Sequence, residues 1–244
     1  MNLLEARDIL EKRGQKLLEE LYGKSGVDDN LKRYEAVLKG FLKEFGEKDV
    51  KLFSSPGRTE ISGNHTDHNN GKVLGGSINL DCVAVATKND SDFVNIISES
   101  FSQKFRVNIK DIEPGTDKIG TVELLKGILA GFRQRGASIG GFDAYITSNV
   151  ISSAGVSSSA AFETLICQII NTLFNEGKLS KTDYAYIGKY AENNYWDKAS
   201  GLLDQMCCAY GGLISIDFAN PDLPKVEEMD FDFAGAKHDL IIVQ

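Results

Sequence analysis

Residues 55–71, which read SPGRTEISGNHTDHNNG, hold an unusual density of groups that donate and accept hydrogen bonds. Asp67 can accept two hydroxyl protons, while Asn64 and His65 can either donate or accept. Such a set favours a polyhydroxylated ligand. Two other interpretations stay open from these residues alone: a metal site built from His65, Asp67 and His68, and a polar surface turn without a ligand.

A second segment, residues 153–161, reads SAGVSSSAA and leads into an apolar, helix-like stretch. Small residues let the backbone approach an anion closely, and the start of the following helix directs free N–H groups and a positive dipole end toward the same place. The serine hydroxyls can also ligate a hard cation such as Mg²⁺. The segment therefore predicts a phosphate-binding loop, with a polar loop that merely caps the helix as the alternative.

The elements that must position these two segments follow from hydrophobic periodicity. Helical patterns are expected over residues 1–45, interrupted by a turn-rich linker at 23–30, and over 122–135, 156–174, 182–195 and 202–209. Strand patterns are expected from residue 50 onward, over 73–88, 93–98, 104–109, 142–150, 213–218 and 238–243. Strands and helices follow one another without a regular βαβ alternation, so the sequence favours an α+β fold.

Composition excludes several classes of protein. The 244 residues are 42% hydrophobic and 25% charged, which is typical of a folded domain. The formal net charge of −8 argues against binding to nucleic acid, because that requires a basic face. No apolar run reaches the roughly 20 residues of a membrane helix, and the N-terminus lacks a signal-peptide pattern. The four cysteines (Cys82, Cys167, Cys207 and Cys208) have no Cys-x-x-Cys spacing. We therefore expect a cytoplasmic protein with reduced thiols.

Taken together and in this order, the two segments resemble the signatures of the GHMP family of sugar kinases, and within it the galactokinases. The galactokinase patterns read approximately Pro-Gly-Arg-x-x-x-x-Gly-Glu-His-Thr-Asp-Tyr-Asn-x-Gly and Gly-x-Gly-Leu-Ser-Ser-Ser-Ala. The resemblance covers residues 55 to about 212. It implies a GHMP kinase N-terminal domain (ribosomal protein S5 domain 2-like, a mixed sheet packed on helices) over 50–244, after a helical extension at 1–49. The family's C-terminal domain has no counterpart before Gln244, so we expect a fragment.

The resemblance nominates two further acidic residues. Galactokinases carry Glu-Ala-Glu-Asn and, further on, Met-Asp-Gln; this chain has YAEN at 190–193 and LDQ at 203–205. By that match Glu192 holds Mg²⁺ together with Ser159. Asp204 is the base that faces the anomeric hydroxyl of the sugar, and Arg58 stabilises the transferring phosphate.

The same resemblance implies the ligands. ATP and Mg²⁺ are the cofactors, and the reaction is phosphorylation of galactose to galactose 1-phosphate. The sugar is expected to contact Asn64, His65, Thr66 and Asp67. ATP is expected to contact Ser98 and the loop residues Ser153, Ala154, Gly155, Val156, Ser157, Ser158 and Ser159.

The sequence departs from the two family patterns at four positions. The residues concerned are Asn64 in place of Glu, His68 in place of Tyr, Ser153 in place of Gly and Val156 in place of Leu. Because the family's Glu meets the 6-hydroxyl, a neutral Asn64 opens the alternative of another hexose or a uronic acid such as galacturonate. A non-catalytic sugar or nucleotide sensor on the same scaffold is a further alternative. Retention of Arg58, Glu192 and Asp204 favours the enzyme.

Overall fold

A computed structural model of the chain describes residues 14–152, 154–231, 233 and 235–241. Its strands are β1 (Lys51–Ser62), β2 (Lys72–Lys88), β3 (Phe93–Ser98), β4 (Gln103–Asn108), β5 (Phe142–Ser148), β6 (Leu213–Asp217) and β7 (Lys225–Met229). Its α-helices are α2 (Gly14–Tyr22), α3 (Val27–Phe45), α4 (Thr121–Gln134), α5 (Ser158–Phe174), α6 (Lys181–Tyr195) and α7 (Leu203–Tyr210). Two short 3-10 helices are η1 (Lys24–Gly26) and η2 (Thr66–Asn69).

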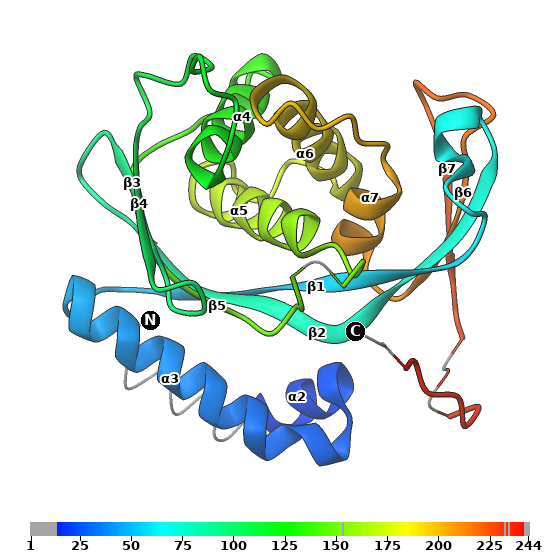
Figure 1. The fold of residues 1–244 in the computed structure, drawn as a ribbon. Helices are drawn as coiled ribbons and strands as arrows, with labels where there is room; N and C mark the ends of the chain where they lie inside the picture. The colour runs from blue at the N-terminus through cyan, green and yellow to red at the C-terminus, as the bar shows by residue number, and fades with distance from the viewer. Residues whose placement is uncertain (1–13, 153, 232, 234, 242–244) are drawn as a thin grey trace.

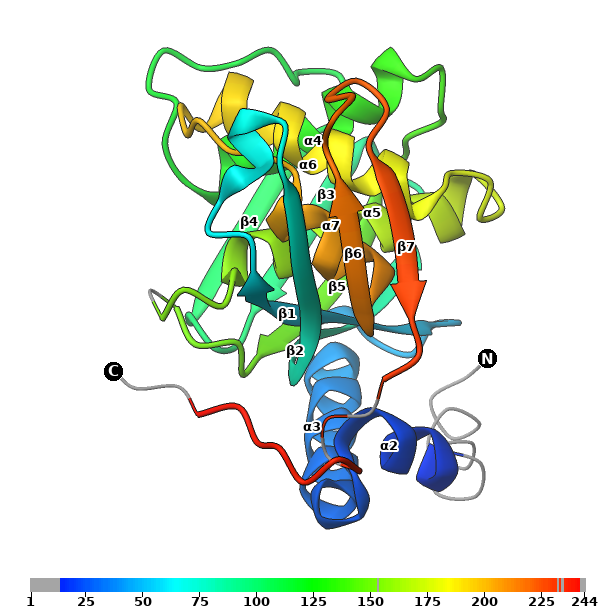
Figure 2. The same ribbon diagram turned by 90° about the vertical axis from the view of Figure 1, so that its right-hand side faces the viewer.

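The strands form one mixed sheet in the order β4-β3-β5-β2-β6-β7, with β1 paired to β2. The 17-residue β2 serves both halves of this sheet: residues 72–76 pair with β6 and residues 82–88 pair with β5. Figure 2 shows β6 and β7 continuing the sheet beside β2. The pairing of β3 with β5 is parallel, whereas β1 and β2 are antiparallel neighbours. The connection between β1 and β2, which contains η2, is the second half of the polar motif at 55–71.

Helices cover both faces of the sheet, with α4 to α7 on one side and α2 and α3 on the other (Figure 1). The sequence of β2 explains why, because successive side chains of a strand point to opposite faces. Val83 and Val85 pack with Phe41 of α3, while Ala84 and Ala86 lie in the core under α5. The small alanine side chains let α5 lie close to β1 and β2.

The α+β fold class predicted from the sequence is confirmed, and most predicted elements form within a residue or two of their expected bounds. The turn-rich linker at 23–30 is shorter than expected, because α3 already begins at Val27. No strand forms over the described residues 238–241 of the last expected strand, since those residues are exposed and lie against no neighbouring strand. Conversely, β7 was not expected: its charged sequence KVEEM suits a sheet edge, where pairing rests on the backbone.

Two expectations extend beyond what the structure covers. The helical pattern over residues 1–13 lies outside the described residues, as do residues 242–244. Among the helices that are described, none is both long and apolar enough to cross a membrane.

Candidate active site

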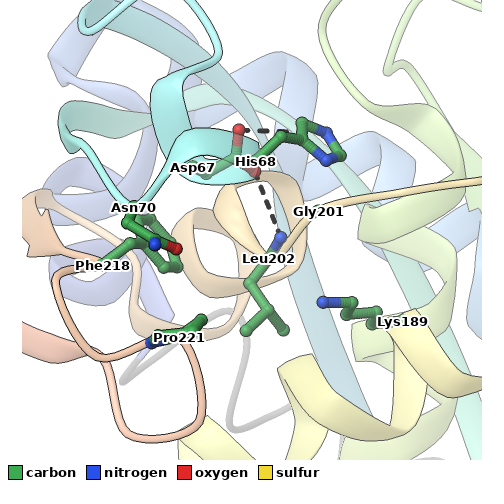
Figure 3. Close-up of a pocket in the computed structure, with 8 residues that line it drawn as sticks. All are labelled: Asp67, His68, Asn70, Lys189, Gly201, Leu202, Phe218 and Pro221. Atoms are coloured by element: carbon green, nitrogen blue, oxygen red, sulfur yellow. Dashed lines mark hydrogen bonds and ion pairs between the residues drawn. The ribbon is translucent and has the colours of Figure 1, made fainter.

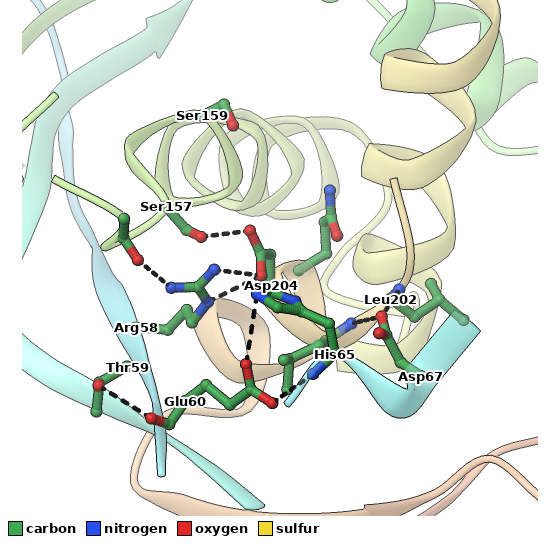
Figure 4. Close-up of polar contacts among 12 residues, drawn as sticks. Arg58, Thr59, Glu60, His65, Asp67, Ser157, Ser159, Leu202 and Asp204 are labelled. Carbon is green, nitrogen blue, oxygen red and sulfur yellow. Dashed lines mark hydrogen bonds and ion pairs between the residues drawn. The ribbon is translucent and has the colours of Figure 1, made fainter. Parts of the chain in front are cut away.

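Arg58 and Asp204, which are far apart in the sequence, form the centre of the site (Figure 4). The Arg58 guanidinium donates from Nε and Nη2 to Asp204 Oδ1, at 2.8 and 2.6 Å. Arg58 Nη1 donates to the carbonyl of Gly155, and the Ser157 hydroxyl donates to Asp204 Oδ2. Only 6% of Arg58 is exposed, so its charge is compensated inside the protein. Strand β1, the serine loop and the first turn of α7 are joined at this one point.

The serine loop is held against β1 at the N-terminus of α5. The backbone N–H of Arg58 donates to the carbonyl of Val156 at 3.1 Å, and a Cβ on Gly57 would lie 2.8 Å from that same oxygen. The absence of a side chain at position 57 therefore permits the close approach. Ser157, the N-cap residue, has a left-handed backbone with φ of 58°. That conformation is uncommon for a residue other than glycine and turns the loop sharply into the helix.

Beyond the N-cap, α5 presents Ser159 to Glu192 of α6. The Ser159 hydroxyl donates to Glu192 Oε1 at 3.0 Å. The Lys198 ammonium lies 2.5 Å from the same Oε1 and 3.3 Å from the Ser159 hydroxyl oxygen. A cation thus already contacts both oxygens, which are the hard donors that Mg²⁺ prefers. The residues present fit the magnesium site that the sequence predicts.

A buried acid lies behind this pair and was not predicted from the sequence. Glu163 is fully buried, and burial together with the nearby Glu192 raises the pKa of Glu163 well above its usual value. The Gln205 amide bridges the two acids, 3.2 Å from Glu163 Oε2 and 3.0 Å from Glu192 Oε2. The raised pKa of Glu163 favours its neutral form in this buried position. The spacing of Ser159 and Glu163, four residues apart on one helix, could have indicated a shared face.

The motif between β1 and β2 contacts the start of α7 through Asp67. Its Oδ2 accepts from the backbone N–H groups of Leu202 and Leu203, at 3.3 and 3.4 Å. Gly201 packs so closely that an added Cβ would lie 1.9 Å from the same oxygen. The side chain of Asp67 is 3% exposed, and Oδ1 lies 3.9 Å from His68 Nε2. The helix that carries Asp204 is therefore fixed directly to the polar motif.

The other predicted sugar contacts lie in the same turn. Asn64 and His65 both have left-handed backbones, with φ of 50° and 58°. The backbone N–H of His65 donates to Glu60 Oε1 at 2.9 Å, and the Thr66 hydroxyl donates to the carbonyl of Lys72 at 3.2 Å. The first bond joins the turn to β1 and the second joins it to β2, close to the Arg58–Asp204 pair shown in Figure 4.

The histidines of the motif point to different acids. His65 Nε2 lies 3.6 Å from Glu60 Oε2, whereas His68 lies beside Asp67. Among the residues that the structure describes, no group of three or more His, Cys, Asp or Glu side chains is arranged to hold a metal ion.

Two pockets flank the central pair. One, of about 170 Å³ (Figure 3), lies beside the polar turn and is lined by Asp67, His68, Asn70, Lys189, Gly201, Leu202, Phe218 and Pro221. The other, of about 240 Å³, lies at the N-terminus of α5 and is lined by Cys82, Ser98, Phe101, Gln103, Phe105, Thr121, Leu124, Ile146, Ser148, Ser152, Ser158, Ser159, Phe162 and Trp196. The second pocket combines apolar side chains with the hydroxyls of Ser98, Ser158 and Ser159.

The structure therefore brings Ser98 together with Ser158 and Ser159 in one pocket. Val156 is buried in the core, and Ala154 packs against it at the edge. These two residues can offer only backbone groups to a ligand. Ser153 lies outside the described residues.

Comparisons with known proteins agree with this geometry. Residues 39–88 match a family model described as the galactokinase galactose-binding signature, and residues 123–212 match one described as the GHMP kinases N terminal domain. A galactokinase of Clostridium tetani is 34% identical over 173 residues, which is 71% of this chain and 44% of the relative. A galactokinase of Streptomyces coelicolor is 30% identical, covering 83% of this chain and 52% of the relative.

Solved structures with a similar fold include a galactokinase and a mevalonate kinase. Lactococcus lactis galactokinase complexed with galactose superposes with a TM-score of 0.73 at 27% identity, covering 80% of this chain and 51% of that one. Methanococcus jannaschii mevalonate kinase, at 18% identity and a TM-score of 0.61, shares the fold. The chain spans about half the length of the curated relatives that it matches. The galactose-binding signature thus falls on β1 and β2 and the GHMP kinase N-terminal domain spans α4 to α7, and the chain is similar to the galactokinases.

Proposed function

We propose that the protein is an ATP-dependent sugar kinase that phosphorylates the anomeric hydroxyl of galactose. The observation that carries this proposal is the position of Asp204. Its carboxylate lies between Arg58 and Ser157 at the start of α5, and the start of the helix that carries it is hydrogen-bonded to Asp67. One carboxylate therefore adjoins both a phosphate-binding element and a hydroxyl-binding element, as transfer between the two ligands requires.

On the nucleotide side, the apolar pocket with Ser98 accommodates the base, and the loop at 154–159 faces the phosphates. The free N–H groups and the dipole of α5 favour negative charge at that end. Ser159 and Glu192 would hold Mg²⁺, which neutralises phosphate charge when it is bound. The Gln205 amide, which donates to both Glu163 and Glu192, keeps the Glu192 carboxylate oriented toward that position.

At the reacting centre, phosphoryl transfer depends chiefly on positioning and on charge stabilisation. Arg58 is fixed by Asp204 and by the Gly155 carbonyl, so its guanidinium is preorganised for developing phosphate charge. Asp204 is the general base: it orients the sugar hydroxyl and accepts its proton as the bond to phosphorus forms. On the sugar side, Asn64, His65, Thr66 and Asp67 supply donors and acceptors from one turn.

A coupled assay of ADP release by the complete gene product tests this proposal. Galactose, galacturonate, glucose and N-acetylgalactosamine are supplied in turn with Mg²⁺ and ATP. We expect ADP release that depends on the sugar, with the highest kcat/KM for galactose. Binding of ATP and galactose without turnover would instead support a sensor on the kinase scaffold, and the proposed activity would be wrong.

A further inference from the structure

Glu60 is a charged residue of the site that neither the motif nor the proposed mechanism uses. It lies on β1 two residues after Arg58; Arg58 pairs with Ser77 of β2 and Glu60 with Gly75, and the register shifts just before Arg58 and just after Glu60. Alternate residues of a strand face the same side, so the Glu60 carboxylate and the Arg58 guanidinium point toward one region. Only 15% of the Glu60 side chain is exposed.

The contacts of the Glu60 carboxylate leave most of its hydrogen-bond acceptor positions unoccupied. Oε1 accepts the backbone N–H of His65 at 2.9 Å, while Oε2 lies 3.6 Å from His65 Nε2, beyond hydrogen-bonding distance. An ionised carboxylate has about four acceptor positions. Among the described residues, the backbone N–H of His65 is the one donor that forms a hydrogen bond with it. Oε2 is therefore available to a hydroxyl of a ligand bound between the turn and β1.

A buried thiol lies between the helix of Asp204 and the strand that pairs with Glu60. Cys207 follows Asp204 by one helical turn, and a Cβ on Gly75, the residue opposite Glu60 on β2, would lie 2.5 Å from the Cys207 Sγ. Burial raises the pKa of the Cys207 thiol to about 12. The part of β2 that pairs with Glu60 therefore packs directly against α7.

The turn after Glu60 has the neutral Asn64 where the galactokinase pattern has Glu. Asn64 has a left-handed conformation with φ of 50°, which asparagine tolerates better than most residues. Glu60 of the neighbouring strand supplies a carboxylate beside this turn, where it accepts the backbone N–H of His65.

We propose that Glu60 determines substrate specificity by accepting a hydrogen bond from one hydroxyl of the bound sugar and by repelling sugars that carry a carboxylate there. The substrate class is then the neutral hexoses, and uronic acids are excluded. This inference rests on the proposed sugar-kinase function.

Glu60→Gln separates recognition from support of the turn, because the Gln side-chain oxygen can still accept the His65 N–H. The complete gene product and this variant are compared on galactose and on each monodeoxy-galactose in turn. In the unmodified protein, we expect kcat/KM to fall about 10- to 100-fold for the deoxy sugar that lacks the hydroxyl recognised by Glu60. In Glu60→Gln, the kcat/KM for galactose should fall by a similar factor, while the kcat/KM for that deoxy sugar should change little. The kcat/KM for galacturonate relative to galactose should rise.

Two further variants complete the test. Glu227→Gln removes an exposed carboxylate on β7 and should leave every ratio unchanged. Glu60→Asp keeps the charge and should still reject galacturonate. If Glu60→Gln lowers kcat/KM equally for all sugars, or for none, Glu60 only supports the turn and the inference is overturned. If the unmodified protein phosphorylates no sugar, the proposed function itself has failed and the inference falls with it.

Discussion

Replacing Asp204 by Asn removes a charge from the centre of the site while preserving its shape. Asn Oδ1 can accept both bonds that Arg58 now donates to Asp204 Oδ1, at 2.8 and 2.6 Å. The Asn amide then faces the Ser157 hydroxyl, which can reverse its role and accept. The substitution therefore isolates the charge and the proton-accepting ability of Asp204.

The expected effects on activity and stability differ in size. Loss of a general base lowers kcat about 10²- to 10⁴-fold. Removing one partner of a fully buried ion pair costs about 3–5 kcal/mol of folding free energy. Here the side chain of residue 204 is 29% exposed and the hydrogen bonds remain, so we expect a loss of about 1–2 kcal/mol. A stable domain survives such a loss.

Three measurements on the same preparation separate these effects: kcat in the coupled assay, the free energy of unfolding in urea, and nucleotide affinity. The single tryptophan of the chain, Trp196, lines the proposed nucleotide pocket, so its fluorescence reports ATP binding directly. Asp217→Asn is the matched control, because Asp217 is also 29% exposed and pairs with Lys72 at 3.0 Å on the sheet. We expect this control variant to lose a little stability and to keep its full activity.

A kcat for Asp204→Asn within a few-fold of the unmodified protein would refute the role of Asp204 as the base. A large loss of ATP affinity in the same variant would also contradict the reasoning, since it would mean that the charge supports the whole site and not the proton transfer.

Three further predictions follow from other contacts. Glu192→Gln should raise the Mg²⁺ concentration for half-maximal activity at least tenfold, which a Mg²⁺ titration measures; ATP binding in EDTA should be unchanged. Gly201→Ala should raise the KM for the sugar at least tenfold without altering ATP affinity, because its Cβ displaces the Asp67 carboxylate. In Asp143, burial raises the pKa but hydrogen bonds, above all from Lys48 at 2.7 Å, outweigh it and lower the pKa overall. The stabilisation of the folded protein by ionised Asp143 is complete above the unfolded-state pKa of about 3.9. It is lost as the pH falls through the lower pKa of the folded state. Asp143→Asn should therefore cost about 1–3 kcal/mol at pH 7 in urea unfolding, and the difference should shrink below pH 4.

The fold was predictable where sequence pattern and local structure agree. The alternation of Val and Ala in β2 and the small residues before α5 indicate a strand covered on both faces and a helix that starts at a loop. Edge strand β7 shows the limit of such reasoning. Its charged residues carry no apolar period, and only pairing with β6 makes it a strand.

The site was predictable in its motifs but not in its supporting residues. Arg58 and Asp204 could be nominated by resemblance, and the structure places them in contact. Lys198 carries no local pattern, and Glu163 is marked only by its spacing from Ser159; the roles of both depend on segments that meet only in the folded chain. Glu60 lies inside the motif, yet its role depends on strand register and on the left-handed turn that follows it.

Phosphorus NMR of the reaction product tests the central claim most directly. The complete gene product is incubated with galactose, ATP and Mg²⁺, and the site of phosphorylation is read from the coupling between phosphorus and the sugar protons. We predict a single new phosphate attached at the anomeric carbon, formed in equal amount to ADP and almost absent with Asp204→Asn. ADP without a sugar phosphate, or a phosphate on any other hydroxyl, would contradict the assignment of Asp204 as the base for an anomeric sugar kinase.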